Sequence, residues 1–94
     1  MKTNKLDRSK VPGWCLGYRF QFEPAQQAYV LLYPEGMIQL NPSAGLVGAL
    51  IDGQRPVAAI ISELQSKFPN VPELGQDVDE FMLHAEDKNW ITLD

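Results

Sequence analysis

The sequence predicts a small α+β domain in which a three-stranded antiparallel meander precedes three helices. Three observations support this class: apolar and polar residues alternate early in the chain, a Pro-Glu-Gly turn separates two apolar runs, and apolar residues recur at helical spacing after residue 41. With 94 residues, of which 45% are hydrophobic, the chain can form one core. We expect a single domain over residues 13–94, preceded by a flexible tail over residues 1–12.

Three strands are expected in the first half of the chain. The first covers Tyr18–Glu23, where aromatic residues alternate with polar ones and therefore share one face. Pro24–Gln27 forms a turn into the second strand, Ala28–Tyr33. Pro34–Gly36 then supplies a tight turn, because proline fixes φ and glycine tolerates positive φ, and the third strand is Met37–Leu40.

Three helices follow the strands. Asn41 is a suitable N-cap, so the first helix is expected over Pro42–Ile51, with proline at a position where its missing N–H costs nothing. Apolar spacing predicts further helices at Val57–Phe68 and Leu74–Asn89. Trp90–Leu93 is expected to form either a short terminal strand or a packed tail.

Composition narrows the range of functions. Cys15 is the only cysteine, so the chain alone forms no disulfide and no thiolate metal site, as expected in a reducing cytoplasm. The N-terminus lacks the apolar core of a signal peptide, and no apolar run approaches the ~20 residues that span a bilayer. The net charge of −4 combines a basic stretch in the first ten residues with an acidic remainder. We expect a soluble cytoplasmic protein.

No catalytic, cofactor-binding or metal-binding residue is expected. His84 is the only histidine, and the sequence near it supplies no nucleophile and orienting group. The acidic residues of the third predicted helix are spaced so that they scatter around it and form a solvated face. Their sign also argues against nucleic-acid binding, which needs Lys and Arg to neutralise phosphates. These acidic residues are Asp77, Asp79, Glu80, Glu86 and Asp87.

The order of the motifs resembles the PqqD family of pyrroloquinoline quinone (PQQ) biosynthesis over about residues 17–92. The shared features are the Pro-Glu turn between strands, Asn41-x-Ser43-Ala44 at a helix start, Asp52-Gly53, a helix ending in Phe68, and an acidic helix before Trp90-Ile91. The resemblance implies a winged-helix-like domain that recognises leader segments of ribosomally made precursor peptides. It also implies a non-catalytic chaperone that carries the precursor peptide PqqA to the radical S-adenosylmethionine enzyme PqqE, which cross-links a Glu and a Tyr within that peptide.

The candidate peptide site combines the third strand with the third helix. The strand is expected to offer unpaired main-chain groups at a sheet edge, and the helix to supply an apolar trough. Core packing is the alternative for every helix residue. Phe81 and Met82 point about 100° apart, so we expect one in the core, with Phe81 assigned there, and the other in the groove. The candidate residues are Met37, Ile38, Gln39, Leu40, Val78, Phe81, Met82 and Ala85.

Two other functions compete with this interpretation. A DNA-binding winged helix would require a basic third helix, which this sequence lacks. A non-catalytic scaffold that self-associates through its sheet edge meets no contrary signal in the sequence. A weak or segment-exchanged homodimer is expected at high concentration, with the basic tail as the segment that crosses between copies.

Overall fold

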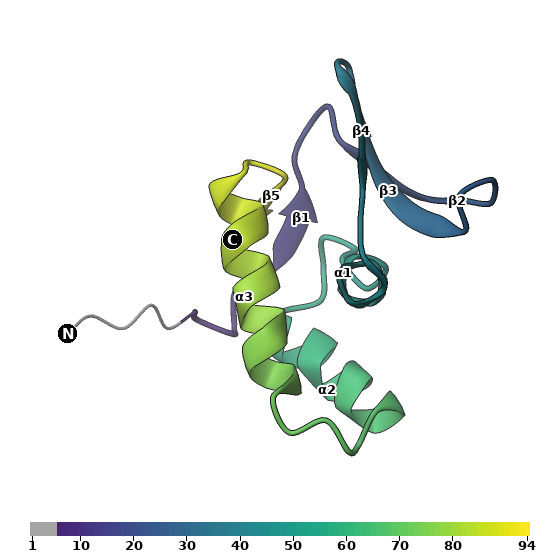
Figure 1. The fold of residues 1–94 in the computed structure, drawn as a ribbon. Helices are drawn as coiled ribbons and strands as arrows, with labels where there is room; N and C mark the ends of the chain where they lie inside the picture. Colours follow the sequence, from purple (N-terminus) through teal and green to yellow (C-terminus); the bar gives the residue numbers. More distant parts are fainter. Residues whose placement is uncertain (1–5) are drawn as a thin grey trace.

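The computed structural model describes residues 6–94 and has two small antiparallel sheets and three helices (Figure 1). The larger sheet has the strand order β2-β3-β4, and the smaller pairs β1 with β5. The α+β class, with a three-stranded meander followed by helices, is therefore confirmed. The elements are β1 (Pro12–Trp14), β2 (Arg19–Glu23), β3 (Ala28–Tyr33), β4 (Gly36–Gln39), α1 (Pro42–Gly48), α2 (Val57–Lys67), α3 (Leu74–Asp87) and β5 (Ile91–Leu93).

The meander has the register that the turn chemistry predicts. Tyr33 lies opposite Gly36, so only two residues connect β3 to β4. Across the sheet, Leu31 is flanked by Phe20 on β2 and by Ile38 on β4. This places Phe20, Leu31 and Ile38 on one face, because side chains of a strand alternate between the two faces of a sheet. The observed strand β4 begins and ends one residue earlier than predicted.

Strand β1 was not predicted from the sequence. Pro12–Trp14 pairs with Ile91–Leu93, and the Cys15 N–H donates to the Trp90 carbonyl oxygen at 2.8 Å. A three-residue strand containing Pro and Gly has little local strand signal, so its partner near the other end of the chain determines it. The terminal strand expected near Trp90–Leu93 is confirmed as β5.

The chain ahead of β1 packs against two helices. Residues 1–5 of the predicted tail lie outside the described residues. The N–H groups of Val57 and Ala58 donate to the carbonyl oxygens of Lys10 and Arg8, each at 2.9 Å, and so cap α2, which begins after Pro56 without a side-chain cap. Arg8 Nη2 also lies 2.7 Å from Asp79 Oδ2 on α3, and this carboxylate raises the pKa of Arg8. The described part of the tail therefore connects α2 to α3.

The three helices begin where predicted and end earlier. Asn41 caps α1, since its Oδ1 accepts a hydrogen bond from the Ala44 N–H at 2.8 Å. Helix α1 ends at Gly48 and not at the predicted Ile51, because the N–H groups of Leu50 and Ile51 bond to carbonyl oxygens three residues back and so form tighter turns. Helices α2 and α3 end one and two residues before the predicted positions.

The main core lies among the helices and β5. Helix α3 contributes one stripe of residues to this core, and the inward faces of α1 and α2 pack against it. The smaller sheet closes the core through Ile91. Its most buried members are Val57, Ile60, Leu64, Val78, Met82, Ala85 and Ile91.

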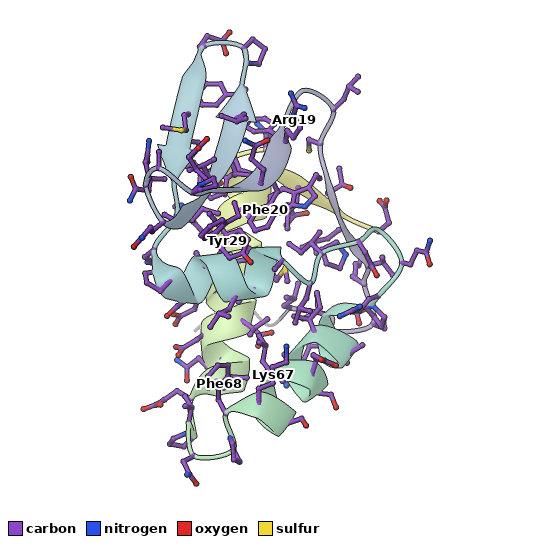
Figure 2. All side chains as sticks on the ribbon, turned by 90° about the vertical axis from the view of Figure 1, so that its right-hand side faces the viewer. Arg19, Phe20, Tyr29, Lys67 and Phe68 are labelled. Carbon is purple, nitrogen blue, oxygen red and sulfur yellow. The ribbon has the colours of Figure 1, made fainter. Side chains whose placement is uncertain are left out.

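Helix α1 packs on the sheet through two glycines that face aromatic rings. Trp14, Phe20 and Tyr29 form a continuous stack with ring centroids 5.2 and 4.9 Å apart. Figure 2 shows Phe20 and Tyr29 between the sheet and α1. A Cβ atom would lie 2.7 Å from Tyr29 Cδ2 if added to Gly45, and 2.5 Å from Phe20 Cε1 if added to Gly48. Only glycine therefore allows this close approach.

The glycine contact predicts an unusual stability change. Gly→Ala in a helix ordinarily stabilises by about 0.5–1 kcal/mol, whereas Gly48→Ala is expected to destabilise by about 1–3 kcal/mol because the new methyl group overpacks against Phe20. Equilibrium urea unfolding of Gly48→Ala with and without Phe20→Leu measures the coupling between the two positions. If Gly48→Ala costs the same free energy of unfolding in both backgrounds, the Phe20 ring is not the cause of the destabilisation.

Candidate functional site

A groove of about 430 Å³ separates the edge of the sheet from α3. One wall comes from β4 and the residues that follow it, including Ile38, Gln39 and Leu40. The other wall comes from α3, and Trp90 also lines the groove. Figure 1 shows β4 on the side of the sheet toward α3, with β2 on the far side. The edge strand β4 therefore lies on one side of the groove, and side chains of α3 lie on the other.

Strand β4 has an unpaired edge within residues 6–94, because only β3 pairs with it. The Leu40 N–H donates to the Tyr29 carbonyl oxygen at 2.9 Å, which identifies these residues as a hydrogen-bonded pair. In an antiparallel ladder such pairs alternate with residues whose N–H and C=O groups point outward. With the observed register, Ile38 bonds to β3, whereas Met37 and Gln39 direct their main-chain groups away from it.

The α3 wall is a stripe of polar and aromatic side chains. Asp77, Glu80, Phe81 and His84 line the groove and follow the i, i+3, i+4, i+7 spacing of one helix face. His84 is exposed, and its ring meets that of Trp90 edge-on with centroids 5.3 Å apart. The wall therefore combines two carboxylates with a partly buried phenylalanine.

The structure corrects the assignment of the predicted helix residues. Val78, Met82 and Ala85 are 1%, 0% and 0% exposed and belong to the core, so their side chains do not line the groove. Phe81, expected in the core, is the residue of the predicted set on α3 that lines the groove. The expected roles of Phe81 and Met82 are thus exchanged. Leu74, Val78, Met82 and Ala85 follow a spacing of four, four and three, which is the regular stripe of a buried helix face.

The four predicted strand residues divide between the two faces of the sheet. Ile38 and Leu40 face the aromatic side, and Ile38, Gln39 and Leu40 all line the groove. The Met37 side chain is 42% exposed and is not among the groove residues. Met37 therefore lies beside the groove, and its main-chain groups point away from β3.

Within residues 6–94, no group of three or more His, Cys, Asp and Glu side chains is placed to hold a metal ion. Cys15 is a partly buried free thiol, and none of the described helices has the length and apolar content required to cross a membrane.

The chain matches the family described as "Coenzyme PQQ synthesis protein D (PqqD)" over residues 28–91. A protein of Pseudomonas syringae pv. syringae (strain B728a) named "PqqA binding protein" is 64% identical over 93 residues, which cover 99% of each chain. A protein of the same name from Pseudomonas fluorescens (strain Pf0-1) is 66% identical over 89 residues, or 95% of this chain and 98% of that one. The chain belongs to the PqqD family.

The PqqD fold is also seen in a solved relative. The solution NMR structure of the PqqD truncation of Methylobacterium extorquens PqqCD superimposes with a TM-score of 0.76 at 26% identity, covering 94% of this chain and 95% of that one. That protein is described as a functional, stand-alone recognition element for ribosomally synthesised and post-translationally modified peptides (RiPPs). The resemblance noted in the sequence is therefore confirmed.

Sequence reasoning missed most of the α3 wall of this PqqD domain. Asp77 and Glu80 were assigned to a solvated face, His84 was given no functional role, and Trp90 was assigned to a terminal strand or tail, yet all four line the groove. The missed signal was a second stripe on α3, rotated away from the core stripe and containing the one aromatic residue of the helix.

The two stripes of α3 predict different costs of truncation. Met82→Ala should lower the free energy of unfolding by about 2–5 kcal/mol, because it leaves a cavity in the core. Phe81→Ala should cost clearly less, since Phe81 is only partly buried. Equilibrium denaturation of both variants measures the difference. A larger loss of unfolding free energy for Phe81→Ala than for Met82→Ala would show that Phe81 belongs to the core.

Proposed function

We propose that this chain binds the precursor peptide PqqA as an additional strand on β4 and presents it to the radical enzyme PqqE. The observation that carries the proposal is that the main-chain groups of Met37 and Gln39 point away from β3, at the edge of a groove that Gln39 lines and whose opposite wall is α3. The names of the two Pseudomonas relatives and the description of the Methylobacterium structure support a peptide ligand.

Strand addition assigns separate roles to the two walls. Main-chain hydrogen bonds to Met37 and Gln39 hold any extended peptide without reading its sequence. Alternate side chains of the peptide then point toward α3, because successive residues of a strand face opposite sides. Phe81 favours an apolar peptide side chain, and the carboxylates of Asp77 and Glu80 favour a basic one nearby. Selectivity would therefore come from α3 and much of the affinity from β4.

The proposed role is that of a binding protein and not of a catalyst. An extended leader in the groove leaves the remainder of the precursor outside it, where the partner enzyme can reach it. The acidic wall made by Asp77 and Glu80 opposes a nucleic-acid ligand, since phosphates require Lys or Arg for neutralisation.

Proline substitution on β4 tests strand addition. Gln39→Pro removes an N–H that points away from β3, so it should weaken PqqA binding about tenfold while the protein stays folded. Gln39→Ala removes only a side chain and should bind within about twofold of the unchanged protein. Isothermal titration with a synthetic PqqA peptide, with and without PqqE, gives the affinities of both variants. In NMR spectra of the unchanged protein, the amide signals of Met37 and Gln39 should shift most when the peptide is added.

The matched control for this test is Ile38→Pro. Its N–H bonds to β3, so this variant should lose stability as well as binding. Equal loss of affinity in the Gln39→Pro and Gln39→Ala variants, with both folded, would contradict strand addition. If PqqE neither joins the complex nor strengthens peptide binding, the proposed presentation to PqqE is contradicted, whereas strand addition is not.

We also propose that the β4 edge supports a weak or segment-exchanged homodimer when no peptide is present. An unpaired strand edge pairs readily with another copy, and Gln39 is the only polar side chain of the segment Met37–Leu40. Because peptide and second copy compete for one edge, sedimentation velocity should show PqqA shifting the dimer toward a monomer–peptide complex. If the dimer binds peptide without a change in association state, the peptide site and the dimer interface are different surfaces, and competition for the β4 edge is contradicted.

A further inference from the structure

A second, smaller groove lies next to the first. It has a volume of about 230 Å³ and opens between α1, the end of α2 and the start of α3. We call it the lower pocket, and it is lined by Leu46, Leu64, Phe68, Val71, Leu74 and Val78 together with three residues named below. Figure 2 shows Phe68 at the end of α2, away from the sheet.

The lower pocket gathers apolar side chains that the fold does not cover. Leu46, Phe68 and Val71 are 43%, 39% and 39% exposed, and they are three of the six large hydrophobic residues exposed within residues 6–94. Single exposed hydrophobic residues are ordinary, whereas a group of them lining one concave surface indicates a binding site. Its volume is below the ~300–1,000 Å³ of small-molecule sites, so it suits a side chain better than a cofactor.

The lower pocket is continuous with the peptide groove. Ser43, Val47 and Asp77 line both of them. A chain that leaves β4 beside Leu40 and continues over α1 therefore passes the Ser43 hydroxyl and the Asp77 carboxylate before it reaches Val71. The two polar groups can accept hydrogen bonds from peptide N–H groups at this crossing.

We infer that the peptide bound to β4 extends beyond the strand and places an apolar side chain in the lower pocket. This inference rests on the proposed function and adds a second anchor to it. The first anchor reads main-chain groups and the second reads one apolar residue at a fixed distance along the peptide. Two anchors joined by a short extended segment give higher affinity than either alone, because the second contact becomes intramolecular.

Nested peptides test the inference. The short probe is the shortest PqqA-derived peptide whose binding is weakened by Gln39→Pro, and the long probes extend it residue by residue at each terminus. One extension that adds an apolar residue should tighten binding about tenfold, as expected for burying one such side chain. Val71→Ser and Phe68→Ala should remove this gain while binding the short probe unchanged.

Two controls keep the result specific. Leu16→Ser alters a fully exposed leucine outside both grooves and should leave both affinities unchanged. Replacing the apolar residue of the long probe by serine should lower its affinity for the unchanged protein, with no further loss from Val71→Ser. Unchanged binding of the short probe also shows that the variants are folded.

Each other outcome overturns the inference. Equal weakening of short and long probes would indicate a structural effect, and no weakening of the long probe would leave the lower pocket empty. A Val71→Ser effect on self-association alone would assign the pocket to a second copy, and an effect seen only with PqqE present would assign it to the enzyme. Failure of both probes to depend on Gln39 would instead reject strand addition, and the inference with it.

Discussion

The approach of α1 to the sheet, through Gly45 and Gly48, is the contact on which the groove depends. Both positions face aromatic rings at distances that no other residue allows. Only Leu40 and Asn41 separate β4 from α1, so a helix held in this place also fixes the end of β4. Because α1 packs against both β3 and α3, it sets the separation between the two walls of the groove.

Helix α3 is fixed at two places, which keeps the second wall in place. In its first half, Asp79 is bound by Arg8 from the chain ahead of β1. After its end, β5 pairs with β1. The pair of Arg8 and Asp79 is partly exposed, so its value is in linking segments and not in a large gain of free energy. Much of the stability of α3 comes from its buried stripe.

The strands and helices of this domain could be predicted because their signals are local. The Pro34–Gly36 turn, the Asn41 cap and the apolar spacing each act over a few residues, and the observed elements begin close to the predicted positions. Strand β1 could not be predicted in this way, because its partner is β5, at the other end of the chain. The close approach of α1 to the sheet could not be predicted either, because the need for glycine at positions 45 and 48 comes from the rings of Tyr29 and Phe20, which contact them only in the folded protein.

The candidate site also has one part that could be predicted from the sequence and one part that could not. The edge of β4 followed from the order of strands, whereas the assignment of Phe81 and Met82 required a choice between side chains about 100° apart on the helix. The two were exchanged because apolar character alone does not distinguish a stripe that faces the core from a stripe that faces a groove. The regular spacing from Leu74 to Ala85 does distinguish them, and Met82 belongs to it.

This geometry separates stability from recognition within one helix. The stripe that contains Met82 is buried, so changes there alter the free energy of unfolding. The neighbouring stripe that contains Asp77 and Phe81 lines the groove, so changes there alter its shape and charge at small cost to the core. In the proposed binding mode the groups that β4 contributes are main-chain atoms, which side-chain replacement leaves intact unless proline is introduced. If the proposed binding mode holds, such a domain can vary the peptides that it selects through α3 while it keeps one mode of binding through β4.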